Sequence, residues 1–185
     1  MKRSLYYVRI AAVLLIIAAM TAMLLAFVNR MTRDVIAENA EEARDAAISE
    51  LFVGMAGTEQ VGAALPDGVN GAYSVQGSDG SIIGYCVDVD SYGYGSDPIN
   101  LLVALDPSGE VSAVKVLSHS ETPGLGSKTV DGSFLSQFEG KSGALAVKKD
   151  GGEIDAVAGA TVSSRAITAG VSLALSLGLG AEGGN

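Results

Sequence analysis

The first pattern along the chain is a run of apolar residues near its N-terminus. Residues 8–28 carry a single charge, Arg9 at the edge, and are otherwise apolar or small. About twenty such residues, rising about 1.5 Å each, cross a hydrocarbon core about 30 Å thick. A cleaved signal peptide has an apolar region of roughly 7–15 residues, whereas this run continues to Phe27 and then meets Asn29. The pattern predicts a retained membrane anchor.

Positive charges flank both ends of this predicted anchor. Lys2, Arg3 and Arg9 lie at its start, and Arg30 and Arg33 follow it. Cationic flanks tend to stay in the cytoplasm. The slight excess before the span therefore predicts a cytoplasmic N-terminus and a domain on the extracytoplasmic side of the plasma (inner) membrane.

Residues 31–53 predict a connecting helix beyond the anchor. Apolar side chains recur there near helical spacing, and acidic ones fall largely on other faces. The apolar positions are Val35, Ile36, Ala40, Ala43, Ala47, Leu51 and Phe52. Gly54, Gly57 and residues 66–68 then interrupt the pattern. We expect an anchor over 1–30, a connecting helix over 31–53 and a domain over 54–185.

Two hairpins are predicted at the start of that domain. Residues 71–76 and 81–90 flank a Ser-Asp-Gly turn, and residues 99–106 and 110–117 flank an Asp-Pro-Ser-Gly turn. In the third of these strands, apolar residues alternate, so one face of the strand carries Ile99, Leu101, Val103 and Leu105.

The rest of the domain mixes short elements with one longer helix. Residues 127–138 have a short helical pattern, residues 143–148 and 153–157 predict strands joined through Asp-Gly-Gly, and a helix is expected from about Thr161 to Leu177. Hairpins with helices at the ends indicate an α+β fold. The predicted fold is an N-terminal transmembrane helix followed by a mainly antiparallel sheet with flanking helices.

Charge is distributed unevenly and argues against two classes of partner for the domain. The first thirty residues hold four cations and no acid, while the remainder holds eight cations and all 21 acids, a formal charge of −13. Such a body repels nucleic acid and anionic lipid headgroups. The chain has no tryptophan and few other aromatic residues, so base-stacking platforms are not expected either.

Cysteine and histidine are each present once. Cys86 alone excludes an internal disulfide, a CxxC pair and an iron–sulfur site, and with His119 it provides too few ligands for a His/Cys zinc site. Cys86 lies in a strand pattern and is predicted to be a small buried hydrophobe. A lone histidine such as His119 is more often structural than catalytic. The sequence has no nucleophile-elbow motif, so a hydrolase is not expected. Any redox chemistry here requires a bound cofactor.

The segment DAVAGATVSS, residues 155–164, places a hydroxyl where a helix begins. Gly159 and Ala160 precede Thr161, and the helical pattern follows directly. One interpretation is a threonine N-cap, which needs no function. The other is a phosphate site, because unpaired N–H groups and the helix dipole attract anions, and small neighbours leave room for a phosphate ester. The residues alone favour the cap.

This segment also carries a resemblance. Asp155, Gly159, Ala160, Thr161 and Ser163 are similar to the signature of the FMN-binding domain family found in the RnfG and NqrC subunits of ion-pumping respiratory complexes. In that family the threonine hydroxyl becomes a phosphoester to FMN, installed by a dedicated flavin transferase that uses FAD as donor. The resemblance implies covalent FMN on Thr161.

Two glycine-rich loops extend the resemblance. Residues 118–126, SHSETPGLG, match the family's loop against the flavin, which implies that Glu121 and Thr122 contact the ring or ribityl chain, with Gly124 and Leu125 beside them. The alternative is a type II turn at Pro123-Gly124. Residues 92–99, YGYGSDPI, resemble a second loop but have Ser-Asp where one glycine is usual. Tyr94 there either stacks on the flavin or packs in the core.

The ordered motifs and the chain length resemble the RnfG type. The resemblance implies a subunit that relays electrons through FMN in a complex that moves electrons between NADH and ferredoxin and transports Na⁺ or H⁺, alongside membrane and iron–sulfur subunits. Arg165 and Lys128 could neutralise the phosphate, although solvated surface positions are the default for both. Two alternatives stay open: an FMN-bearing sensor or electron carrier outside that complex, and an anchored interaction module without flavin.

Overall fold

The structure is a computed structural model that describes residues 2–61 and 65–180, with side chains from residue 7 onward. It divides into two compact units, residues 1–43 and residues 44–185. The ends of the predicted anchor and domain, residues 1 and 181–185, lie outside the described residues.

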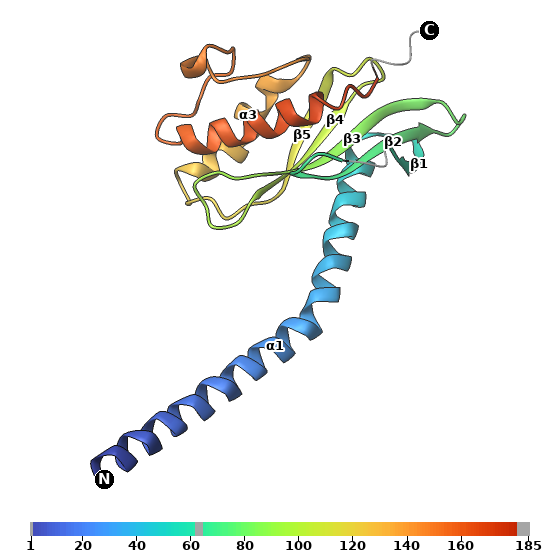
Figure 1. The fold of residues 1–185 in the computed structure, drawn as a ribbon. Helices are drawn as coiled ribbons and strands as arrows, with labels where there is room; N and C mark the ends of the chain where they lie inside the picture. The colour runs from blue at the N-terminus through green and yellow to red at the C-terminus, as the bar shows by residue number, and fades with distance from the viewer. Residues whose placement is uncertain (1, 62–64, 181–185) are drawn as a thin grey trace. The chain divides into compact units, whose positions relative to one another are not determined.

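One helix, α1 (Lys2–Leu51), runs through both the predicted anchor and the predicted connecting segment (Figure 1). Residues from Tyr7 onward form a helix long and apolar enough to cross a membrane, and no residue of its most apolar stretch is buried in protein. Apolar side chains that face outward all around a helix are suited to lipid. The helix predicted over residues 31–53 is confirmed as far as Leu51 and continues the apolar run without a break.

Residues 44–185 are built on a five-stranded antiparallel sheet in the sequential order β1-β2-β3-β4-β5 (Figure 1). The strands are β1 (Met55–Gln60), β2 (Val69–Gly77), β3 (Ile82–Ser91), β4 (Ile99–Leu105) and β5 (Val111–Ser118). Both predicted hairpins are confirmed, β2–β3 and β4–β5, because the turn residues between them close two-strand ladders. The antiparallel α+β prediction is confirmed as well.

Strand β1 was not predicted. It lies at the sheet edge, most of its residues are exposed, and its pairing with β2 is irregular between Met55 and Gly57. An exposed edge strand with a glycine at a bulge has no alternation of buried and exposed residues for a sequence pattern to detect.

Both faces of the sheet are covered. On one face, α3 (Thr161–Leu175) packs Ile167 and Val171 against Leu101 and Val103 of β4 in the larger hydrophobic cluster. On the other face, the last turns of α1 and Phe52 pack against a smaller cluster that contains Leu102 and Cys86. Strand β4 is therefore buried on both faces, not only on the predicted one.

Cys86 is fully buried, as predicted. Burial raises the pKa of its thiol to about 12, because a thiolate is poorly solvated inside the protein. The thiol therefore stays protonated and unreactive at neutral pH.

The region between β5 and α3 combines short helices with an irregular loop. The predicted helical pattern at 127–138 is confirmed by η1 (Gly126–Val130), α2 (Gly132–Leu135) and η2 (Ser136–Phe138). The predicted strands 143–148 and 153–157 are wrong. The structure has one isolated parallel bridge, between Val147 and Ile154, and a 3-10 turn, η3 (Lys148–Asp150).

Two features of this segment explain the wrong strand prediction: two of its apolar residues are buried, and a tight turn separates them. Val147 and Ile154 are both buried in the core, which produces the apolar signal. Gly151 follows η3 with φ of 86°, and a Cβ on Gly152 would lie 2.0 Å from the Ala146 carbonyl oxygen. The chain thus folds back tightly through two glycines and brings its two buried residues together without forming a ladder.

Packing of the α1 end on the sheet yields a first prediction. Phe52 is 8% exposed, while its neighbour Val53 is 92% exposed. We expect Phe52→Ala to lower the free energy of unfolding by about 3 kcal/mol, because it leaves a cavity beside Gly84 and Leu105. Val53→Ala, the matched control, should change it by less than about 0.5 kcal/mol. Urea unfolding of the full chain in detergent micelles, followed by tyrosine fluorescence, measures both. Equal losses in the two variants would contradict the packing.

Candidate functional site

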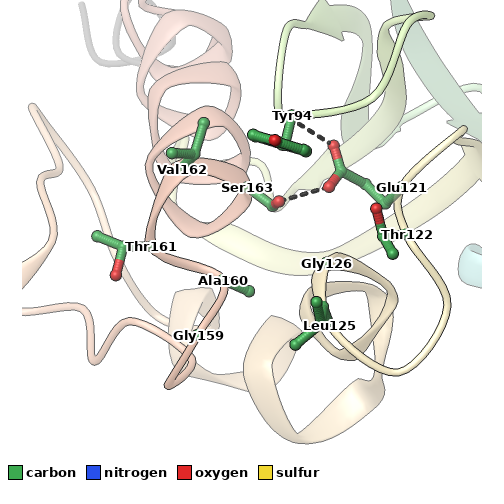
Figure 2. A pocket seen from close by; sticks show the side chains of 10 residues that line it. All are labelled: Tyr94, Glu121, Thr122, Leu125, Gly126, Gly159, Ala160, Thr161, Val162 and Ser163. Carbon is green, nitrogen blue, oxygen red and sulfur yellow. Dashed lines mark hydrogen bonds between the residues drawn. The ribbon is translucent and has the colours of Figure 1, made fainter.

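A cavity of about 390 Å³ lies where three segments converge (Figure 2). One is the loop after β3, another is the loop after β5 with the start of η1, and the third is the beginning of α3. Its lining residues are Tyr94, Glu121, Thr122, Leu125, Gly126, Gly159, Ala160, Thr161, Val162 and Ser163. The three segments that the sequence singled out are thus the three walls of one pocket.

The carboxylate of Glu121 joins these walls. Its Oε1 accepts hydrogen bonds from the backbone N–H groups of Tyr94 (2.9 Å) and Gly95 (3.1 Å), and its Oε2 accepts one from the hydroxyl of Ser163. Figure 2 shows the contacts with Tyr94 and Ser163. The residue is only 4% exposed. A buried carboxylate needs such donors, since an unpaired one would be strongly destabilising. Both oxygens accept hydrogen bonds from the protein itself, so Glu121 ties together the walls of the pocket that it also lines.

Electrostatics keep Glu121 ionised. Burial by itself raises the pKa of the carboxyl, but the hydrogen bonds from Ser163 and from the backbone N–H groups of Gly95 and Tyr94 outweigh it, so the pKa is lowered. Hydrogen bonds to the charged form have this effect because protonation would weaken them.

Two glycines leave room for this carboxylate. A Cβ on Gly93 would lie 2.2 Å from Glu121 Oε1, and a Cβ on Gly126 would lie 2.1 Å from Oε2. Neither distance is possible for a real side chain. The glycines of the two loops therefore have a packing reason, which is the close approach of their backbones to one buried acid.

Thr161 is the first residue of α3, but it does not cap the helix. The N-cap position belongs to Ala160, and no side chain makes a capping hydrogen bond there. The interpretation of Thr161 as an N-cap is therefore wrong. Its Oγ1 instead accepts a hydrogen bond of 3.2 Å from the ammonium group of Lys149. The hydroxyl lies beside the first-turn N–H groups of α3, which have no intrahelical partners.

Exposed apolar side chains line the same pocket as Thr161. Tyr94 is 77% exposed, Leu125 51% and Val162 49%, and all three line the pocket. Tyr94 is therefore not a core residue, which excludes the core-packing alternative for it. Single exposed hydrophobic residues are common, but three around one cavity form a rim suited to a flat apolar ligand.

Some of the predicted site residues lie outside the pocket. The carboxylate of Asp155 pairs with Lys148 (2.6 Å), and its backbone N–H donates to Gln137. Gly124 adopts φ of 75° within a turn closed by the N–H of Leu125 and the carbonyl of Thr122, as a type II turn requires. It shapes the loop and does not line the cavity.

The remaining charged candidates have local roles. His119 accepts a hydrogen bond from the backbone N–H of Glu121 through Nδ1 (3.2 Å), in keeping with a structural histidine. Arg165 makes a two-pronged ion pair with Asp150, both contacts at 2.6 Å. Lys128 is exposed on η1.

Sequence reasoning missed three residues of the site. Gly126 and Val162 line the cavity. Both lie inside the motifs, but only neighbouring residues of those motifs were predicted to contact the cofactor. Lys149 was missed because it lies in the connection between the two predicted strands, 143–148 and 153–157, where no site residue was expected. A pair of lysines before Asp-Gly-Gly was the available signal, but the sequence does not tell which of the two faces Thr161.

The lowered pKa of Glu121 leads to a prediction about acid stability. Because the folded pKa lies below the unfolded one, the stabilisation is present above the unfolded value, about 4.3, and is lost as the pH falls through the folded value. We expect Glu121→Gln to lower the free energy of unfolding at pH 7 by about 2 kcal/mol, since charge-assisted hydrogen bonds are lost. The gap between variant and wild type should close towards acid pH. Urea unfolding across pH measures it, with the exposed Glu139→Gln as control. A pH-independent gap would contradict the assignment.

Comparison with known proteins covers both units of the chain. Residues 93–176, which include all the lining residues, match the sequence profile of the FMN-binding domain, and residues 1–51 match that of the RnfG N-terminal region. The G subunit of a proton-translocating ferredoxin:NAD(+) oxidoreductase complex from Clostridium ljungdahlii is 46% identical over 93 residues, 48% of this chain and 50% of that protein.

Two further relatives are named as G subunits of ion-translocating oxidoreductase complexes. The one from Stutzerimonas stutzeri is 42% identical over 104 residues, 52% of this chain and 45% of the relative. In the Clostridium and Stutzerimonas proteins the match thus spans about half of the relative's length. The one from Pseudomonas aeruginosa is 34% identical over 172 residues, 82% of this chain and 79% of the relative. The chain belongs to the family of G subunits of ion-translocating, Rnf-type oxidoreductase complexes and carries that family's FMN-binding domain.

Proposed function

We propose that this chain is a membrane-anchored flavoprotein subunit that relays electrons through FMN joined by a phosphoester to Thr161. The observation that carries the proposal is the position of the Thr161 hydroxyl. It lies at the first residue of α3, on the wall of a pocket, and is not used as a helix cap. A hydroxyl free of a structural task, beside unpaired N–H groups, is suited to carry a phosphate.

The residues around the pocket fit FMN. The phosphate would lie at the helix N-terminus, near Lys149, where the dipole and the ammonium group both favour an anion. Gly159 and Ala160 leave space beside it, and the exposed side chains of Tyr94 and Leu125 would contact the isoalloxazine. Thr122 would offer a hydroxyl to the ring or the ribityl chain. The cavity is within the usual size range of cofactor sites.

The redox chemistry would belong to the flavin. Bound FMN supplies a ring that takes up one or two electrons, and a phosphoester leaves that ring unmodified. The chain's own residues would hold and orient the cofactor. Glu121 is committed to the walls of the pocket, and Cys86 is buried with a raised pKa, so neither is offered as a reactive group. This arrangement suits an electron relay.

The setting of the relay is part of the proposal. Helix α1 would anchor the chain, with residues 1–30 in the membrane, 31–53 connecting and 54–185 forming the flavin domain on the extracytoplasmic side. A covalent bond would prevent loss of FMN where no flavin pool replaces it. Because the matched relatives are subunits of proton- or ion-translocating complexes, we propose membrane and iron–sulfur subunits of an Rnf-type complex as partners, lipid around α1, and a flavin transferase for maturation.

The attachment site yields a direct prediction. After co-expression with a flavin transferase, the denatured wild-type chain should gain the mass of one FMN less one water and fluoresce in a gel. Thr161→Ala should abolish both signals, and Thr161→Ser should retain them, because serine keeps the hydroxyl. Thr58→Ala, which removes an exposed threonine hydroxyl of β1 outside the pocket, is the control and should stay labelled.

Two control measurements accompany this test, one of protein stability and one of transferase activity. The unlabelled Thr161→Ala chain should unfold within about 0.5 kcal/mol of wild type, because its hydroxyl caps nothing, so loss of labelling cannot be ascribed to misfolding. A known acceptor protein must be labelled in parallel. An unlabelled wild type beside a labelled acceptor would leave the interaction module without flavin as the better account.

A further inference from the structure

Lys149 is held next to Thr161 by the backbone on either side of η3. On one side Val147 is buried and bridges to Ile154, and on the other side the turn through Gly151 and Gly152 closes against the carbonyl of Ala146. The Lys149 side chain is exposed, yet its ammonium group lies 3.2 Å from the Oγ1 of Thr161. The fold therefore presents one cation to this hydroxyl.

The other cations near the start of α3 are engaged elsewhere. Lys148 pairs with Asp155, and Arg165 makes a two-pronged ion pair with Asp150. Asp150 has a lowered pKa, first through the hydrogen bond from Arg165 and also through the charges of Arg165 and Lys149. Of these three cations, Lys149 is thus the one whose ammonium group is directed to the hydroxyl of Thr161 and not to a carboxylate.

We propose that Lys149 is the phosphate-binding residue of the flavin attachment site. Its ammonium group orients the Thr161 oxygen before the phosphoester forms and neutralises the phosphodiester afterwards. A phosphodiester carries one negative charge, and charge-assisted hydrogen bonds from an ammonium group to such an anion are strong ones. This inference rests on the proposed attachment of FMN to Thr161.

The chemistry balances with FAD as the flavin donor. The Oγ1 of Thr161 attacks the phosphorus on the riboflavin side of FAD, and the new O–P bond forms as the P–O bond of the anhydride breaks. AMP leaves with the bridging oxygen, and the hydroxyl proton goes to a base of the transferase or to water. Lys149 donates to a lone pair of the oxygen, so the hydroxyl proton remains free to leave.

The test compares lysine variants of the full chain in detergent micelles, incubated with purified flavin transferase and FAD. The variants are Lys149→Gln, Lys149→Arg and the control Lys141→Gln, in which the replaced lysine pairs with Glu153. Intact mass gives the rate of labelling, the ³¹P resonance of the labelled chains reports the phosphate's surroundings, and thermal melting checks that each variant folds.

We expect Lys149→Gln to be labelled about fivefold more slowly at low salt, as for loss of an exposed charge pair, and less so at high salt, where screening weakens the contact. Lys149→Arg and Lys141→Gln should stay within about twofold of wild type. The ³¹P resonance should move in Lys149→Gln and not in Lys141→Gln.

Each other outcome has a separate meaning. Equal labelling rates and an unmoved resonance in Lys149→Gln would overturn the role of Lys149 while leaving Thr161 as the attachment site. Slow labelling with an unmoved resonance would assign Lys149 to the encounter with the transferase and overturn phosphate binding. Arginine as slow as glutamine would overturn the charge argument. No adduct on wild type, with a known acceptor labelled, would overturn the attachment itself and this inference with it.

Discussion

The carboxylate of Glu121 is the contact on which the candidate site depends. It is a buried negative charge whose three donors come from the loop after β3 and from α3, while Glu121 itself belongs to the loop after β5. Separating any of these segments would leave a charge unpaired in a dry environment, which is far less stable than the paired arrangement. Ser163 lies two residues beyond Thr161, so the bond that holds Ser163 also fixes the first turn of α3 and the hydroxyl it carries.

The sheet gives this site a rigid base. Helix α3 is fixed along its length by burial of Ile167 and Val171, by the hydroxyl of Ser91, which donates to the carbonyl of Ala166, and by Gly170, where a Cβ would lie 2.7 Å from the Leu101 side chain. A site on the end of a packed helix is held more firmly than one on loops alone. The exposed side chains of Tyr94, Leu125 and Val162 at the pocket leave it accessible from solvent, as the proposed electron relay would require.

Sequence patterns predicted the elements whose apolar residues have a regular spacing. The hairpins around β2–β3 and β4–β5 and the helix from Thr161 have regular spacing and clear turn residues, and the structure confirms them. Strand β1 lacks alternation because it lies exposed at an edge. The segment around Val147 and Ile154 has strand-like residues, but two glycines fold it back before a ladder can form.

The candidate site was likewise predictable in part. The motifs identified its three walls, because each wall is a short segment with a characteristic composition. The contacts that hold it together could not be predicted, since Glu121 and Ser163 are 42 residues apart and Lys149 and Thr161 are 12 apart. Contacts between residues that are distant in sequence depend on how the whole chain folds. A helix-initial threonine looked like a cap in sequence, and only the geometry assigned that position to Ala160.

The most direct measurement is fragmentation mass spectrometry of the tryptic peptide that spans residues 150–165, prepared from chain matured with a flavin transferase. This peptide contains three hydroxyl side chains, those of Thr161, Ser163 and Ser164. Ser163 and Ser164 are buried and hydrogen-bonded within the protein, so we expect the mass of FMN less one water on Thr161 alone. The same mass on either serine, or a peptide that stays unmodified while a known acceptor is labelled, would contradict the account.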